Sequence, residues 1–185
     1  MQRKYIAFGV TLAAWLGADQ LTKWLVVKNL REGVDTVAII DGLLTFEHAR
    51  NTGAAFSMLE GQMAVFAVFT VVALGVIGQM LWQLDGKGAT IQAVALGTIA
   101  GGALGNGVDR LLYQSVTDFI RVYTNNPTVS GWLIEAIGSN AWPTFNIADV
   151  AIFVGLGLAA IGMFFEEDDA ELAPEPPAKP LDANL

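Results

Sequence analysis

The stretch ATIQAVALGTIAGGALGNGVDRLL, residues 89–112, is an apolar run that ends in a polar block. It slightly exceeds the ~20 residues that a helix needs to cross a bilayer, and its glycines are small enough for close helix packing. Three further runs are similarly long and apolar: Tyr5–Val27, Gln62–Trp82 and Ile147–Phe165. Together the four runs predict a mainly α-helical integral membrane protein with four transmembrane helices.

The composition agrees with a membrane protein. Of the 185 residues, 54% are hydrophobic and 15% are charged, and the mean hydropathy is +0.49, which is too apolar for an ordinary soluble domain of this size. The formal net charge of -8 disfavours nucleic acid as a partner and is concentrated in residues 166–185, with seven acids and one lysine. We therefore predict a four-helix transmembrane domain over 1–165 and an acidic, proline-rich, disordered tail over 166–185.

The first apolar run has an alternative interpretation as a cleavable signal peptide, because Arg3 and Lys4 precede it. Asp19 and Lys23 lie late in this run, which then continues through Val27. That pattern favours a retained membrane helix.

The connections between the runs carry their own signals. Val37–Ile40 and Leu43–Glu47 are strand-like and flank Asp41-Gly42, a dipeptide suited to a tight hairpin turn. They predict a small extramembrane β-sheet between the first and second transmembrane helices. The long connection after the third run has turn signals around an apolar patch at 132–134, which we expect at the membrane interface.

Polar residues gather at one predicted depth. Four spans place both termini on one side of the membrane, and the unusual polar residues then fall near the opposite side. Charges at membrane depth are costly and usually face a bundle interior or a wet cavity. The residues in question are Asp19, Lys23, Asn51, Asn106, Asp109, Arg110, Asp118, Asn146 and Asp149.

Two carboxylates at one apolar-walled site, Asp118 and Asp149, push each other's proton affinities apart, as acid/base chemistry requires. The alternative is that these polar residues only cap and pair helix ends, and it stays open above all for Asp109 with Arg110 or Lys23. No cysteine is present, so disulfides and cysteine-based metal sites are excluded.

Other chemistries have less support. Ser57 or Ser115 could act as a nucleophile with Lys23 as its base, but neither lies in a nucleophile-like turn motif. His48 is the only histidine; we expect it at the surface, and it leaves no paired-histidine metal motif. A proton-coupled transporter that uses the two carboxylates and a passive membrane scaffold also remain as hypotheses, although no internal repeat is visible.

Five short blocks together resemble the lipoprotein signal peptidase family, also called signal peptidase II. Each block is weak alone, but the ordered set on four runs is specific, and it covers about Arg3 to Phe165. The blocks are Asp19-Gln20-Leu21-Thr22-Lys23, Asn51-Thr52-Gly53-Ala54-Ala55-Phe56, Gly105-Asn106-Gly107-Val108-Asp109-Arg110, Val116-Thr117-Asp118-Phe119 and Phe145-Asn146-Ile147-Ala148-Asp149.

The resemblance implies an aspartic endopeptidase without metal or cofactor, whose catalytic pair is Asp118 and Asp149. Its substrates would be diacylglyceryl-modified prolipoproteins, cut just before the lipidated lipobox cysteine. Other implied partners are membrane lipids and cyclic-peptide inhibitors such as globomycin, and the implied state is a monomer. The residues that would bind substrate or support the pair are Asp19, Lys23, Asn51, Gly53, Ala55, Asn106, Asp109, Arg110 and Asn146.

The resemblance also implies a bacterial cytoplasmic (inner) membrane location, with both termini cytoplasmic and the active site near the outer face. The distribution of Lys and Arg does not favour this orientation by itself. We expect Arg110 to contact the neighbourhood of Asn106 and a substrate carbonyl. Two features depart from the family pattern: an apparent insertion over Tyr123–Ala141, and the acidic tail.

Overall fold

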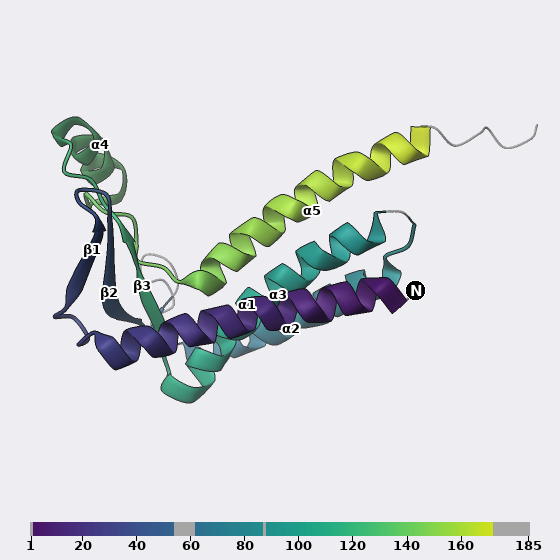
Figure 1. Cartoon of the computed structure of the whole chain (residues 1–185), viewed down its shortest axis with the longest axis horizontal. Coiled ribbons are helices and arrows are strands. Elements are labelled where there is room, and N and C mark those ends of the chain that lie inside the picture. The colour runs from purple at the N-terminus through teal and green to yellow at the C-terminus, as the bar shows by residue number, and fades with distance from the viewer. Residues whose placement is uncertain (1, 54–61, 87, 172–185) are drawn as a thin grey trace, which may run out of the picture.

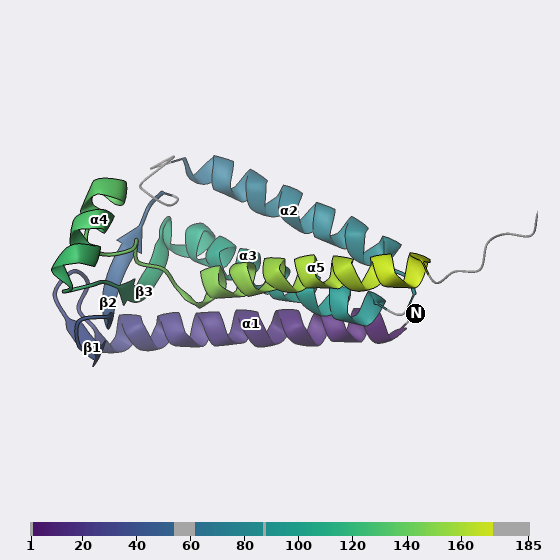
Figure 2. The ribbon, with the colours of Figure 1, turned by 90° about the horizontal axis from the view of Figure 1, so that it is seen from above.

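The computed structural model describes residues 2–53, 62–86 and 88–171. Long helices lie side by side, and a small antiparallel sheet with a short helix beside it covers one end of them (Figures 1 and 2). The long helices are α1 (Gln2–Asn29), α2 (Met63–Gln83), α3 (Ala89–Tyr113) and α5 (Ile147–Glu171); the sheet contains β1 (Thr36–Ile40), β2 (Leu44–Asn51) and β3 (Val116–Val122), and the short helix is α4 (Pro127–Ile137).

Both ends of the described chain lie at the same end of the helices, far from the sheet (Figure 1). This is the arrangement that four alternating runs predict. Among the described residues, α2 over Ala64–Gln83 and α3 are long and apolar enough to cross a membrane, whereas the apolar part of α5, Ile147–Gly162, is shorter. The predicted count of four spans is therefore not confirmed by length and composition.

Helix α3 occupies the centre of the bundle and packs against α1 and α5. Its glycines make this possible: a Cβ on Gly97 would lie 2.6 Å from the Phe8 carbonyl oxygen, and one on Gly102 would collide with the Ala148 carbonyl oxygen. The prediction that these small residues serve close helix packing is confirmed. A buried apolar cluster between α2 and α3 adds to the core: Ile77, Leu81, Ala93, Leu96 and Ala100.

The sheet has the order β1-β2-β3. Its first two strands form the predicted hairpin, and Gly42 in the turn adopts a φ of 75°, which favours glycine. The prediction was incomplete, because β3 comes from the connection between α3 and α5. It pairs with β2 and sets Asp118 opposite Ala49. Non-local pairing thus brings a predicted catalytic residue into the sheet.

Two boundaries differ from the predictions. The apolar patch at 132–134 belongs to helix α4, whose start is marked by Asn126 as N-cap and Pro127 in the first turn. Helix α5 continues through Glu171 and so extends into the predicted tail over 166–185. The part of the tail over 172–185 lies outside the described residues.

Candidate active site

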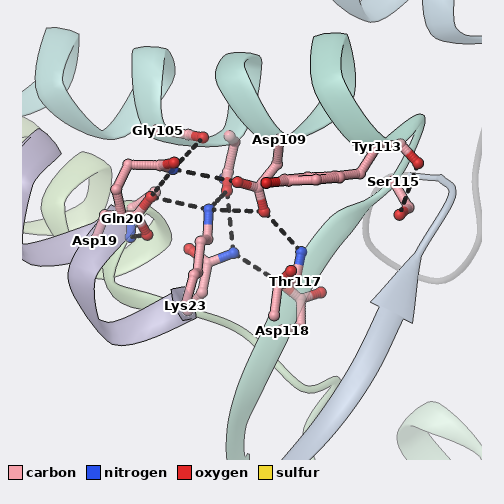
Figure 3. A network of polar contacts seen from close by, with 12 residues as sticks. Asp19, Gln20, Lys23, Gly105, Asp109, Tyr113, Ser115, Thr117 and Asp118 are labelled. Carbon is pink, nitrogen blue, oxygen red and sulfur yellow. Dashed lines mark hydrogen bonds and ion pairs between the residues drawn. The ribbon is translucent and has the colours of Figure 1, made fainter. Parts of the chain in front are cut away.

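Lys23 on α1 is the centre of a buried ion cluster. Its Nζ lies 2.9 Å from Oδ2 of Asp19 and 3.4 Å from Oδ2 of Asp109, and all three side chains are almost inaccessible to solvent (Figure 3). Backbone donors complete the cluster, since the Ala148 N–H donates to Asp19 and the Thr117 N–H donates to Asp109, each at 2.9 Å. Asp19 therefore joins α1 to the start of α5, and Asp109 joins α3 to β3.

Gln20 belongs to the same cluster, although it was not among the predicted site residues. Its Nε2 lies 3.1 Å from the Asp19 carboxylate, 3.2 Å from the Gly105 carbonyl and 3.2 Å from the Asp109 carboxylate. Gly105 is needed here, because a Cβ at that position would collide with Oδ2 of Asp19. The signal was available in the first polar block, where Gln20 directly follows Asp19.

Asn106 connects the ion cluster to a second polar group. Its Oδ1 accepts from Lys23 Nζ at 2.9 Å and from Asn146 Nδ2 at 3.0 Å, while its Nδ2 donates to Asp149 at 2.8 Å. An ammonium group can only donate, so Lys23 determines which way the Asn106 amide faces. Its NH₂ group is thereby directed at the Asp149 carboxylate.

Asn146 and Asp149 form a reciprocal cap at the start of α5. The Asp149 N–H donates to Oδ1 of Asn146, and the Asn146 N–H donates to Oδ2 of Asp149, each at 3.1 Å. This is the capping-box arrangement, which satisfies two backbone donors that a helix start leaves unpaired. The prediction that Asp149 lies in a first helical turn is confirmed. The cap holds the Asp149 carboxylate in a fixed position.

Asp118 on β3 completes the site. Its carboxylate accepts from Asn146 Nδ2 at 2.7 Å and from Asn51 Nδ2 at 2.9 Å. The Asn51 oxygen is itself engaged by the Gly53 N–H at 3.0 Å, which turns the Asn51 amide nitrogen toward Asp118. Burial raises the pKa of Asp118, and the charge of Asp149 raises it further, although the hydrogen bond from Asn51 opposes the shift. Two carboxylates are thus linked through one asparagine, and Asp118 holds its proton to a higher pH than a free carboxyl does.

Arg110 makes two contacts that were not predicted. Its Nη2 lies 3.2 Å from the Gly53 carbonyl oxygen, and its guanidinium lies 4.3 Å from the centre of the Phe66 ring. Asn106 is four residues earlier on the same helix, but its side chain bonds instead to the lysine, asparagine and aspartate described above. Arg110 also lines an apolar groove of about 400 Å³ between α2 and α3. It therefore ties the end of β2 to the third helix.

Three other predicted participants are not among the residues described above. Ala55 and Ser57 lie outside the described residues. Ser115 donates to the Tyr113 carbonyl at 3.3 Å, whereas Lys23 is engaged in the ion cluster, so this serine and lysine do not form a nucleophile–base pair (Figure 3).

The prediction that His48 lies at the surface was wrong. It is buried in β2, and its Nδ1 lies 3.0 Å from the Leu30 carbonyl oxygen. It therefore fastens the sheet to the end of α1. Within the described part of the chain, no group of three or more His, Cys, Asp or Glu residues could hold a metal ion.

The order of these groups along the chain and their convergence in space match a known family. A sequence model of the family described as Signal peptidase (SPase) II matches residues 11–165. The chain belongs to this signal peptidase II family. The match includes every described residue of the ion cluster and of the two-carboxylate site.

Relatives in the signal peptidase II family are similar over most of their length. The lipoprotein signal peptidase of Shouchella clausii (strain KSM-K16) is 40% identical over 151 residues, which is 82% of this chain and 88% of that protein. The lipoprotein signal peptidase of Listeria monocytogenes serotype 4a is 38% identical over 158 residues, 85% of this chain and 92% of the relative.

Two solved structures, each described as a bacterial membrane enzyme determined by the in meso method, share the fold. One has a TM-score of 0.73 at 28% identity and covers 90% of this chain and 93% of its own. The other has a TM-score of 0.67 at 29% identity, with coverage of 84% and 91%. The signal peptidase II fold of this chain is therefore mainly helical with a small sheet, and membrane enzymes share it.

Proposed function

We propose that the protein is an aspartic endopeptidase that removes the signal peptide from diacylglyceryl-modified prolipoproteins by cutting just before the lipidated lipobox cysteine. The observation that carries the proposal is the linkage of Asp118 and Asp149 through Asn146. An aspartic mechanism needs two carboxylates that hold one proton between them. Burial of Asp118 and its proximity to a second carboxylate favour this state.

In this mechanism, an ionised carboxylate removes a proton from a water molecule as the water oxygen attacks the scissile carbonyl carbon. The protonated partner donates a hydrogen bond to the carbonyl oxygen, on which negative charge develops. A proton then passes to the amide nitrogen, the C–N bond breaks, and a carboxylic acid and the amino group of the cysteine are released. The deeply buried Asp118 suits the protonated role, and the half-buried Asp149 suits the base.

The surrounding residues position this pair. Asn51, Asn106 and Asn146 donate to the two carboxylates, and Lys23 fixes the direction of Asn106. Asp19 and Asp109 balance the charge of Lys23 and join three helices and β3 at this depth. Gly53 and Arg110 shape the edge where the substrate would enter, and Ala55 belongs to the same proposed substrate-binding set. No cofactor takes part in these steps.

We infer that α1 and α5 also cross the membrane, which makes four spans. Two charged residues in the second half of α1 are buried, with Asp19 at 0% and Lys23 at 3% exposure, whereas Leu21 and Trp24 are more than half exposed. On α5, Phe153 is 80% exposed. Apolar side chains outside and charges inside are the pattern of a helix surrounded by lipid.

The proposed orientation has both termini in the cytoplasm and the site near the outer face of the bacterial cytoplasmic (inner) membrane. There the acyl chains of a substrate stay in lipid while its scissile bond reaches the two carboxylates. Reaction of a cysteine placed at Glu135, beside the sheet, with an impermeant maleimide outside intact cells measures this orientation. We further propose a monomer that binds membrane lipids and cyclic peptides such as globomycin, with residues 166–185 outside the catalytic domain.

The function is tested with the full-length protein in lipid bilayers and a synthetic lipobox peptide. We expect cleavage on the amino side of a diacylglyceryl-cysteine, identified by the product masses, and much slower cleavage of the same peptide without its lipid. A protein that leaves the lipidated peptide intact but carries protons across liposomes would contradict the proposal and support the transporter hypothesis.

We expect Arg110→Lys to lower kcat/KM by roughly tenfold or more, the scale of a lost hydrogen bond to a charged group. A planar guanidinium can donate to the Gly53 carbonyl while its face covers Phe66, and an ammonium cannot do both. Arg50→Lys is the matched control, because Arg50 also lies near an aromatic ring, Tyr113, but donates to Thr117. Equal kinetics of the two folded variants would exclude the positioning role of Arg110.

A further inference from the structure

Helix α4 is well specified by its own sequence. The Asn126 side chain accepts from the Thr128 N–H at 3.0 Å and the Val129 N–H at 3.3 Å, and Pro127 occupies the first turn. Gly138 ends the helix with a φ of 75°. These are ordinary start and stop signals of a helix.

This helix nevertheless lacks a core to support it. Every residue of α4 is described, and none is buried. A helix of 11 residues is only marginally stable in water by itself. Val129 and Trp132 are 45% and 66% exposed, and with Ala136 they have the spacing of one helix face. The half-buried Leu133 and Ile137 lie on the side that packs against the protein.

The segment that contains α4 is held at both ends on the sheet. Tyr123 and Ala141 form an isolated antiparallel bridge. The Tyr123 N–H donates to the Leu43 carbonyl, and the Trp142 N–H donates to the Val122 carbonyl, each at 2.9 Å. The predicted insertion over 123–141 thus leaves the sheet at the end of β3 and returns to the same place. Strand β3 is the one that carries Asp118.

The position of α4 relative to the long helices is that of a helix on a membrane surface. It lies at the same end as the candidate site, and its axis runs across the axes of the long helices (Figures 1 and 2). A helix in the interface plane has this orientation when the long helices cross the bilayer. Residues 123–141 contain a single charge, Glu135, and no Lys or Arg.

We propose that α4 is a membrane-surface helix whose face of Val129, Trp132 and Ala136 lies in the interfacial zone of the outer leaflet. The inference rests on the proposed orientation of the protein. Tryptophan is enriched at this depth of membranes, and the exposed Trp142 lies five residues after the last residue of the helix, Ile137. A segment with one charge offers little electrostatic complementarity to a protein partner, whereas its tether on the sheet keeps it beside the lipid surface.

The consequence is a second attachment of the sheet to the bilayer. Helices α1 and α3 hold the sheet from one side, through His48 and Asp109. Helix α4 would hold the far end of β3, so that Asp118 stays at a constant height above the lipid. An exposed residue on the opposite side of α4, Ile134, would remain in water.

The absence of cysteine makes a site-directed spin-labelling test direct. Ala136→Cys and Ile134→Cys are labelled with a nitroxide in the full-length protein, which is placed in vesicles of phosphatidylcholine and phosphatidylglycerol. We expect the label at 136 to collide more with oxygen and less with a water-soluble nickel chelate than the label at 134. The ratio of the two collision rates should differ severalfold between the positions.

Two outcomes would overturn the proposal. Equal nickel accessibility at both positions would place α4 in water, and a label at 136 that is immobile and shielded from both reagents would indicate contact with protein, such as a second copy. The measurement needs no catalysis. A lipid-exposed label at 136 in a protein that cleaves nothing would therefore contradict the peptidase function alone.

Discussion

Asp118→Asn and Asp149→Asn are each expected to reduce cleavage of a diacylglyceryl lipobox peptide by roughly 10³-fold. Asparagine keeps the size of aspartate and part of its hydrogen bonding, but it cannot exchange a proton. Both variants should insert and fold, because an asparagine at position 118 can still accept a hydrogen bond from Asn51 or Asn146, and position 149 retains a capping side chain. The measurement is turnover per folded molecule in bilayers.

The double variant should be scarcely slower than either single variant, because residues that act as one unit are not additive. Asp109→Asn is the matched control: it alters a buried aspartate of the same network that contacts Lys23 and Thr117, not the two carboxylates. It should lose stability first and keep activity per folded molecule. Substantial turnover by either Asp118→Asn or Asp149→Asn would exclude the aspartic mechanism.

The dependence on pH provides an independent check of the same pair. Because burial raises the pKa of Asp118, the proton of the pair is retained to a higher pH than a free carboxyl would allow. The stabilising contribution of this proton is complete below the unfolded-state pKa and is lost as pH rises through the folded-state pKa. Stability of the wild type should therefore decline over that interval, and the decline should be smaller in Asp118→Asn.

The sequence predicts the large-scale arrangement well, for a physical reason. A bilayer requires long apolar runs, and the few charges within them must be buried together, so the positions of Asp19, Lys23 and Asp109 along their runs are enough to assign them to one region. The hairpin at Asp41-Gly42 was predictable because its turn needs a residue that tolerates positive φ. The hairpin signal is local in the sequence, and the apolar runs follow from the requirements of the bilayer.

What the sequence did not predict depends on contacts between distant segments. Strand β3 pairs with β2, where Asp118 lies opposite Ala49, and this pairing partner cannot be read from VTDFIRV alone. Arg110 turns to Gly53 because the end of β2 lies beside α3. The ring of the buried His48 bonds to the Leu30 carbonyl, just after the end of α1. In each case the partner is distant in sequence.

The stability of the site depends most on one lysine. We expect Lys23→Met to destabilise the protein by about 3–5 kcal/mol, because it leaves two buried carboxylates without their counter-ion. Asp19 is 0% exposed and Asp109 is 2% exposed, so water cannot replace the ammonium group. The measurement is the unfolding of the protein by heat or denaturant, in a bilayer or in detergent.

The triple variant Lys23→Met, Asp19→Asn, Asp109→Asn separates charge from shape. It removes all three charges while keeping side chains of similar volume, so it should recover much of the stability that Lys23→Met alone loses. Its activity per folded molecule should nevertheless stay low, because Asn106 no longer has an ammonium group to fix its direction toward Asp149. A triple variant as unstable as Lys23→Met would show that packing, and not charge balance, is what Lys23 supplies. Full activity in the triple variant would show instead that Asn106 keeps its direction without Lys23.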